Sequence, residues 1–213
     1  MNSSRRGYRE SRDRTIKRRA PELGYYFIVT DTEETETNYL IGLKNSIPKN
    51  LQDKLVIKVC KTDTKKLVRE ALDMASLHPQ FGEIWIVFDK DQVKNFDKII
   101  EEAEANDIKV GWTNPCLEEW FHAYFGKMPY AKDSVQCCYN FSSEFEKRTG
   151  QKYHKNDKDI YTKLNKYGNE EKAIEIAEYK LNEQIRNDNI VPSTMNPATT
   201  VHRLIKEIKM KSK

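Results

Sequence analysis

Residues 83–91 read Glu-Ile-Trp-Ile-Val-Phe-Asp-Lys-Asp, and this stretch decides the fold. Its five consecutive apolar residues do not alternate with polar ones, which is typical of a central strand buried on both faces of a parallel sheet. Asp89 and Asp91 leave the carboxyl end of this strand, where open α/β sheets bind their ligands. The stretch therefore predicts both the centre of a sheet and the place of its chemistry.

The spacing of Asp89 and Asp91 predicts a site for a hard cation. In extended chain two such carboxylates lie on the same side, about 7 Å apart at the backbone, and a cation between them relieves their repulsion. A few oxygen ligands suit Mg²⁺ or Mn²⁺, which keep bound waters and recruit substrate phosphate oxygens. The alternative is a solvated turn in which an aspartate caps the next helix.

Strand and helix patterns alternate around this central strand. A doubly wound parallel sheet is therefore the expected α/β architecture. Asn114-Pro115 and Asn196-Pro197 each fit the cap and first residue of a helix. The further strands are predicted at 25–30, 54–60 and 108–112, and helices at about 92–105 and 169–187.

Strand signals stop near residue 134, and only helical spacing follows. We therefore predict a disordered basic arm over residues 1–22, an α/β domain over 23–130 and a helical region over 131–213. No stretch approaches the roughly 18 apolar residues of a membrane span, and no apolar leader opens the chain, so we expect a cytoplasmic protein. The four cysteines form no Cys-x-x-Cys pair, which favours reduced structural thiols over a zinc site.

The positive charge is concentrated at the start of the chain. Residues 1–20 carry eight basic and two acidic side chains, a net charge of +6, whereas the whole chain carries +4. Such an arm pairs readily with phosphates, although a solubilising tail is the alternative. Its basic residues are Arg5, Arg6, Arg9, Arg12, Arg14, Lys17, Arg18 and Arg19.

The strand at 25–30 also ends in acidic residues, namely Asp31, Glu33 and Glu36. In doubly wound sheets the first strand commonly neighbours the central one, so these groups and the two aspartates can face one crevice. Divalent ions held there would polarise a phosphodiester, while a remaining carboxylate handles protons.

Four ordered motifs carry a resemblance to a known family. Residues 26–39 read Tyr-Phe-Ile-Val-Thr-Asp-Thr-Glu-Glu-Thr-Glu-Thr-Asn-Tyr, and 86–91 read Ile-Val-Phe-Asp-Lys-Asp. Residues 113–122 read Thr-Asn-Pro-Cys-Leu-Glu-Glu-Trp-Phe-His, and 196–204 read Asn-Pro-Ala-Thr-Thr-Val-His-Arg-Leu. With the basic arm, this order resembles that of RloB-like proteins over almost the whole chain.

The resemblance implies a Toprim-like nuclease of bacterial restriction and phage-defence gene clusters, often encoded beside an ATPase. It implies a four-stranded parallel sheet, Asp89 and Asp91 as Mg²⁺ ligands joined by Asp31, and an acid after the first strand as general acid or base. Family members usually show Glu-Gly-Glu there, whereas this chain has Asp31, Thr32 and Glu33. Asp31 is thus the acid by position, and Glu33 is the alternative. Candidate substrate-binding residues are Asn114, Glu118, His122, Lys155 and Arg203.

Two other functions compete with a nuclease. A haloacid-dehalogenase-type phosphatase also uses Asp-x-Asp after a strand, but that motif follows its first strand and requires paired acids on a later one. A non-catalytic subunit that binds nucleic acid or a protein partner would retain metal binding without cleavage. The nucleic acid, the partner ATPase and a homo-oligomeric state stay open at the level of sequence.

Overall fold

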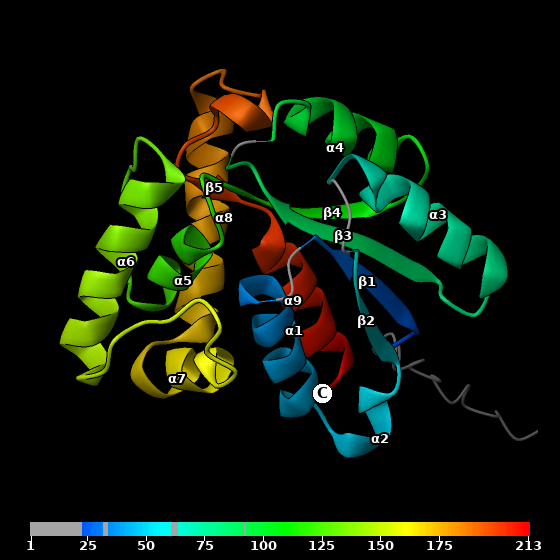
Figure 1. Cartoon of the computed structure of the whole chain (residues 1–213), viewed down its shortest axis with the longest axis horizontal. Helices are drawn as coiled ribbons and strands as arrows, with labels where there is room; N and C mark the ends of the chain where they lie inside the picture. Colours follow the sequence, from blue (N-terminus) through cyan, green and yellow to red (C-terminus); the bar gives the residue numbers. More distant parts are fainter. Residues whose placement is uncertain (1–22, 32–33, 61–63, 92) are drawn as a thin grey trace, which may run out of the picture.

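The computed structural model describes residues 23–31, 34–60, 64–91 and 93–213 (Figure 1). Its strands form one sheet in the order β2-β1-β3-β4-β5, in which β1 to β4 run parallel and β5 pairs antiparallel with β4. The predicted α/β class is confirmed, and the sheet is consistent with a Toprim-like fold. The strands are β1 (Tyr26–Thr30), β2 (Leu55–Val59), β3 (Glu83–Asp89), β4 (Lys109–Asn114) and β5 (Ala198–Thr199).

Helices cover both faces of the sheet. Helices α1 (Thr35–Ser46) and α9 (Val201–Lys211) lie on one face, and α3 (Leu67–Leu77) and α4 (Phe96–Glu104) lie on the other (Figure 1). Among the described residues, no helix combines the length and apolar composition that crossing a membrane requires. Helices α5 (Glu118–Tyr124), α6 (Ser134–Thr149), α7 (Ile160–Tyr167) and α8 (Glu170–Arg186) gather beside the β4–β5 edge, and the short elements are α2 (Lys49–Gln52), η1 (Thr64–Lys66) and η2 (Pro192–Thr194).

The central strand β3 is buried on both sides, as its unbroken apolar run predicts. Trp85 and Val87 pack in the core on the α1/α9 side, and Ile86 and Phe88 pack in the core on the α3/α4 side. Each such side chain contributes roughly 1.5–3 kcal/mol when it is fully buried. The strand is thereby fixed in register, and the position of Asp89 at its end is fixed with it.

The fifth strand was not predicted from the sequence. β5 is only two residues long, and it is held by threonine side chains. The Thr199 and Thr113 hydroxyls lie 2.8 Å apart, and the Thr200 hydroxyl accepts from the Trp112 N–H (2.9 Å) and donates to the Val110 carbonyl (2.8 Å). The region 131–213 therefore returns to the sheet through β5 and α9, while its boundary at residue 130 stays a prediction.

Two predicted helix caps are wrong. Asn114 ends β4, its amide donates to the carbonyls of Pro192 and Ser193, and α5 begins only at Glu118. Asn196 likewise precedes β5, and α9 begins only at Val201. The predicted helix at 92–105 starts later, at Phe96. By contrast, the long helix at 169–187 is confirmed as α8.

Candidate active site

Four carboxyl groups gather beyond the carboxyl ends of β1 and β3. Asp31 follows β1, Glu36 lies in the first turn of α1, and Asp89 ends β3. Glu118 opens α5 after the turn that leaves β4. Because β1 and β3 are paired neighbours, with Thr30 opposite Val87, their ends reach the same edge of the sheet. The two acidic strand ends therefore lie close together, and Glu118 joins them; we call this group of four carboxyl groups the crevice.

These carboxyl groups perturb one another electrostatically. Burial raises the pKa of Glu36 to about 7, and the nearby Asp31 carboxylate adds to the shift. Burial also raises the pKa of Asp89 well above its ordinary value, with Glu36 and Glu118 as the next causes. The pKa of Asp31 is raised by burial as well. Several negative charges therefore cannot coexist here without a proton or a cation.

Hydrogen bonds hold one oxygen of Asp31 and one oxygen of Asp89. Asp31 Oδ2 accepts from the Thr64 hydroxyl at 2.8 Å, and Asp89 Oδ2 accepts from the Leu117 N–H at 2.9 Å. Within the described ranges, Asp31 Oδ1 and Glu36 Oε2 are buried without a hydrogen-bond partner. A buried carboxylate oxygen left unpaired is costly, so the arrangement is complete only when another group binds these oxygens.

The donor set fits a hard divalent cation. It consists of carboxylate oxygens alone, which Mg²⁺ and Mn²⁺ prefer over nitrogen or sulfur. The two unpaired oxygens belong to Asp31 and Glu36, and the Asp89 carboxyl group is close enough to Glu36 for each to shift the other's pKa. Among the described residues, Asp31, Glu36 and Asp89 are therefore the ones placed to hold the ion.

Asp91 does not join this buried group. Its backbone has a positive φ of 22°, its side chain is exposed, and its carboxylate accepts a hydrogen bond from the Ser134 hydroxyl. The turn after β3 thus carries the two aspartates apart, and Asp91 stands at the exposed rim of the crevice. Its predicted metal contact stays a prediction. Glu33 and the basic residues of the arm lie outside the described residues.

The sequence of this chain matches one family of proteins over most of its length. A family model described as "RloB-like protein" matches residues 26–208. The chain belongs to the RloB-like family. The matched range contains all four carboxyl groups of the crevice. No curated protein and no solved structure matches this RloB-like chain.

The remaining predicted substrate-binding residues of this RloB-like protein are spread over different surroundings. Asn114 binds the η2 carbonyls, and Arg203 is exposed on α9, where its charge acts on Glu178 and His202. Lys155 Nζ lies 3.8 Å from Glu118 Oε1. Of these residues, only Lys155 therefore stands beside the carboxyl groups.

His122 does not pair with Glu118, although the two are four residues apart on α5. Its ring packs edge-on against Phe141 at 5.5 Å between centroids, and neither ring nitrogen has a partner among the described residues. Burial lowers the pKa of His122 to about 4. The Glu118 carboxylate instead accepts from the Tyr153 hydroxyl at 2.9 Å. A substrate contact by His122 stays a prediction.

Sequence reasoning missed the groups that support the acids. The Thr64 hydroxyl holds Asp31 from 33 residues further along the chain. Tyr153 holds Glu118 from 35 residues away, a contact that no local pattern announces. Glu119 is also fully buried, accepts from the Cys137 thiol at 3.4 Å, and has a pKa raised to about 8 by burial. Its position three residues after Cys116 gave no signal of this.

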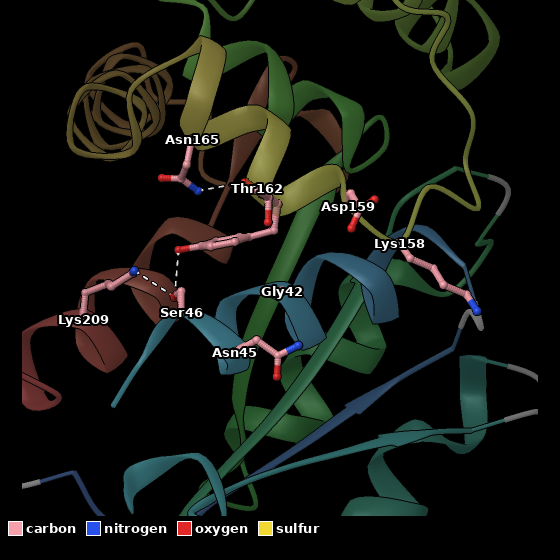
Figure 2. Close-up of a pocket in the computed structure, with 9 residues that line it drawn as sticks. Gly42, Asn45, Ser46, Lys158, Asp159, Thr162, Asn165 and Lys209 are labelled. Carbon is pink, nitrogen blue, oxygen red and sulfur yellow. Dashed lines mark hydrogen bonds between the residues drawn. The ribbon is translucent and has the colours of Figure 1, made fainter. Parts of the chain in front are cut away.

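A hollow of about 380 Å³ lies elsewhere, among α1, α7 and α9 (Figure 2). Its polar groups satisfy one another: Lys209 Nζ donates to the Ser46 hydroxyl at 3.0 Å, and that hydroxyl donates to Tyr161 at 3.2 Å. None of the predicted catalytic residues lines it. The crevice with its unpaired carboxylate oxygens is therefore the better candidate active site.

Proposed function

We propose that this RloB-like protein is a metal-dependent nuclease that hydrolyses phosphodiester bonds in RNA, with transfer RNA as one candidate, or in DNA. Its biological role would be that of an effector in bacterial anti-phage defence or abortive infection. The observation that carries the proposal is the pair of buried, unpaired carboxylate oxygens of Asp31 and Glu36, beside Asp89 at the end of the central strand. Such a donor set suits phosphoryl chemistry assisted by Mg²⁺ or Mn²⁺.

Asp31 and Asp89 would hold the ion, with Glu36 beside them and Asp91 at the rim facing the substrate. A bound ion of this kind polarises a phosphodiester and lowers the pKa of a bound water. The Leu117 N–H keeps Asp89 oriented, and the Thr64 hydroxyl does the same for Asp31. These hydrogen bonds fix the carboxylates before substrate arrives, which is what positioning a reactive phosphate requires.

Glu36 is the best-placed group for proton transfer. Its pKa of about 7 lies near neutral pH, where a general acid or base is most effective. Asp31, which stands where the family usually has a glutamate, is the second candidate. Lys155 brings a positive charge beside Glu118 at the same crevice and can face a phosphate oxygen.

A non-catalytic binding subunit is the second candidate function, favoured by Asp31 and Thr32 in place of the usual Glu-Gly. A dehalogenase-type phosphatase has less support, because among the described strands neither β4 nor β5 ends in paired acids. We further propose that the protein acts in the cytoplasm, alongside a partner ATPase, and that it can form a homo-oligomer.

The experiment that tests the proposal is incubation of the purified protein with labelled DNA and with total transfer RNA, in Mg²⁺, Mn²⁺ or chelator. We expect cleavage of at least one substrate with metal and none with chelator. Asp107→Asn is a matched control, because Asp107 is exposed at the opposite end of the sheet, before β4. Metal binding without cleavage of either substrate would favour the binding subunit.

Saturating Mg²⁺ should stabilise the protein through these acids. At 100 times its dissociation constant a ligand contributes about 2.7 kcal/mol, which corresponds to roughly 5–10 °C in the melting temperature of a chain of this size. Differential scanning fluorimetry at pH 8 checks this. Asp89→Asn should lose most of the shift, whereas Asp107→Asn should keep it. An equal shift in both variants would place the ion elsewhere.

The basic arm should contribute affinity and leave the chemistry intact. If about four of its eight basic side chains meet phosphates, deleting residues 1–20 should flatten the slope of log affinity against log salt by roughly 3–4 units on a duplex. Turnover at saturating substrate and low salt should survive the deletion. Fluorescence anisotropy across a salt series measures the slope, and an unchanged slope would make the arm a solubilising or partner-docking tail.

A further inference from the structure

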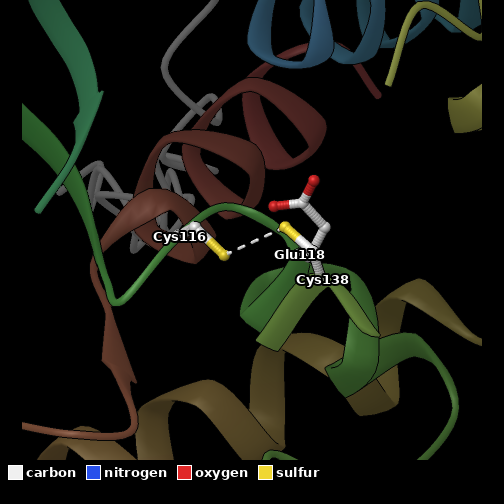
Figure 3. A group of neighbouring side chains, drawn as sticks. All are labelled: Cys116, Glu118 and Cys138. Atoms are coloured by element: carbon white, nitrogen blue, oxygen red, sulfur yellow. Dashed lines mark hydrogen bonds between the residues drawn. The ribbon is translucent and has the colours of Figure 1, made fainter. Parts of the chain in front are cut away.

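Two thiols and one carboxylate form a compact group next to the acidic crevice. One ligand atom each from Cys116, Glu118 and Cys138 lies within 4.8 Å of the other two (Figure 3). Cys116 lies in the turn between β4 and α5, Glu118 opens α5, and Cys138 lies on α6. The close-up shows the two sulfur atoms facing each other with the carboxylate beside them. Two segments of the fold, the β4–α5 turn with the start of α5 and helix α6, thus converge on one point.

The distance between the sulfur atoms fits a metal-bound pair. Cys116 Sγ and Cys138 Sγ lie 3.9 Å apart. Two sulfurs bound tetrahedrally at about 2.3 Å from one zinc ion lie about 3.8 Å from each other. A disulfide would require them to approach to about 2.05 Å. The spacing therefore matches a shared cation without movement of the backbone.

The surroundings meet the other needs of a metal site. Cys116 and Glu118 are buried, whereas Cys138 is partly exposed, so an ion can enter from the α6 side. Glu118 is oriented by the Tyr153 hydroxyl at 2.9 Å, which is the kind of supporting contact that metal ligands have. Lys155, 3.8 Å from Glu118, offsets the negative charge that two thiolates and a carboxylate would leave around a divalent ion.

We infer that Cys116, Cys138 and Glu118 form a binding site for a thiol-preferring divalent cation of the zinc class, with a fourth position open to water. Binding releases the two thiol protons to solvent, since only thiolates coordinate the ion. Hard Mg²⁺ disfavours sulfur, so this site is separate from the carboxylate site. Cys137 is not a ligand, because its thiol donates to Glu119. In this proposal Cys116 and Cys138 are metal ligands, whereas the sequence favoured structural thiols.

Cobalt titration of the full, reduced, metal-stripped protein tests the inference. We expect one equivalent of Co²⁺ to produce a near-ultraviolet sulfur-to-cobalt charge-transfer band that excess Zn²⁺ abolishes and excess Mg²⁺ leaves unchanged. Cys116→Ser and Cys138→Ser should each weaken binding at least about 100-fold, because loss of even a supporting residue typically costs 10- to 100-fold. No band in the wild-type protein would overturn the inference.

Controls separate loss of a ligand from loss of the fold. Cys60→Ser should keep the band, because Cys60 is buried in the separate core on the α3/α4 side. Asp89→Asn should keep it as well, which makes the result independent of the proposed nuclease site. Since Cys138 is partly exposed, Cys138→Ala should stay folded by circular dichroism. A full-strength band in folded Cys138→Ala would assign the cobalt to other residues and overturn the inference.

Discussion

Asp89→Asn should abolish metal-dependent cleavage, with a loss of at least ~10³-fold, or about 4 kcal/mol of transition-state stabilisation. Asp89 ends the central strand, and the Glu36 and Glu118 carboxylates act on it electrostatically, so its charge lies at the centre of the crevice. Asparagine keeps the oxygen that accepts from the Leu117 N–H, and the fold should therefore remain intact. Initial rates of cleavage in saturating Mg²⁺ measure the effect, and the melting temperature in chelator should change by only a few degrees.

Asp91→Asn is the matched comparison for Asp89→Asn, because Asp91 follows two residues later in the chain. Asp91 is exposed and its carboxylate is held by Ser134, so its loss should reduce cleavage less than the loss of Asp89 does. Asp107→Asn, at the other end of the sheet, should cut at the wild-type rate. If Asp89→Asn also retained the wild-type rate, the metal-site assignment would be wrong. A larger loss in Asp91→Asn would mean that its side chain turns inward when metal binds.

The sequence predicted the sheet well where strands are long and apolar. Residues 83–88 could be assigned from composition alone, because a strand buried on both faces needs apolar residues at every position. β5 could not be assigned, since two residues show no periodicity and their pairing depends on Thr199 and Thr113 meeting across 86 positions of sequence. The helix caps predicted at the two Asn-Pro pairs were wrong for a similar reason. The cap pattern is local, whereas the side chains of Asn114 and Asn196 bind carbonyl groups far away in the sequence.

The sequence predicted only part of the candidate site. Asp31 and Asp89 could be placed because parallel strand ends share one edge of a sheet, and Glu36 because it follows within one helical turn. The separation of Asp91 from Asp89 depends on a positive φ in the turn, which the Asp-x-Asp spacing does not encode. The thiols of Cys116 and Cys138 are 22 positions apart, and no Cys-x-x-Cys pattern announces their contact.

Glu36→Gln should reduce cleavage by about 10²- to 10⁴-fold, the contribution of a positioned general acid or base. Glutamine has the same shape but can neither carry the negative charge nor act as a proton donor or acceptor at this pH, so the step that Glu36 gives to the pH–rate profile should disappear. Asp31→Ala should lose at least about 10²-fold if that residue shares the role. Single-turnover rates between pH 5 and 9 show which of the two residues transfers the proton, because only substitution of that residue removes the step.

The same substitution should stabilise the metal-free protein as pH rises. The pKa of Glu36 is raised from 4.5 to about 7 in the folded state, so folding favours the protonated acid. Its stabilising contribution is complete below pH 4.5 and is lost as pH rises through about 7. Relative to wild type, Glu36→Gln should therefore gain on the order of 3 kcal/mol in the free energy of unfolding between pH 4 and pH 8. Urea denaturation in chelator measures that difference.

Two comparisons test whether the gain in the free energy of unfolding comes from the ionisation of Glu36. The lowered pKa of His122 destabilises both proteins equally as pH falls below its ordinary value, so it cancels in the difference. In Glu144→Gln the lost carboxylate has a pKa lowered to about 2 by hydrogen bonds from Arg148 and Lys127, so the difference from wild type should be flat between pH 5 and 8. In saturating Mg²⁺ at pH 8 the wild-type protein should be more stable than Glu36→Gln, because the ion favours the ionised glutamate that the variant lacks. A Glu36→Gln difference that stays flat with pH would show that this acid is ionised without metal, and that the crevice needs no cation.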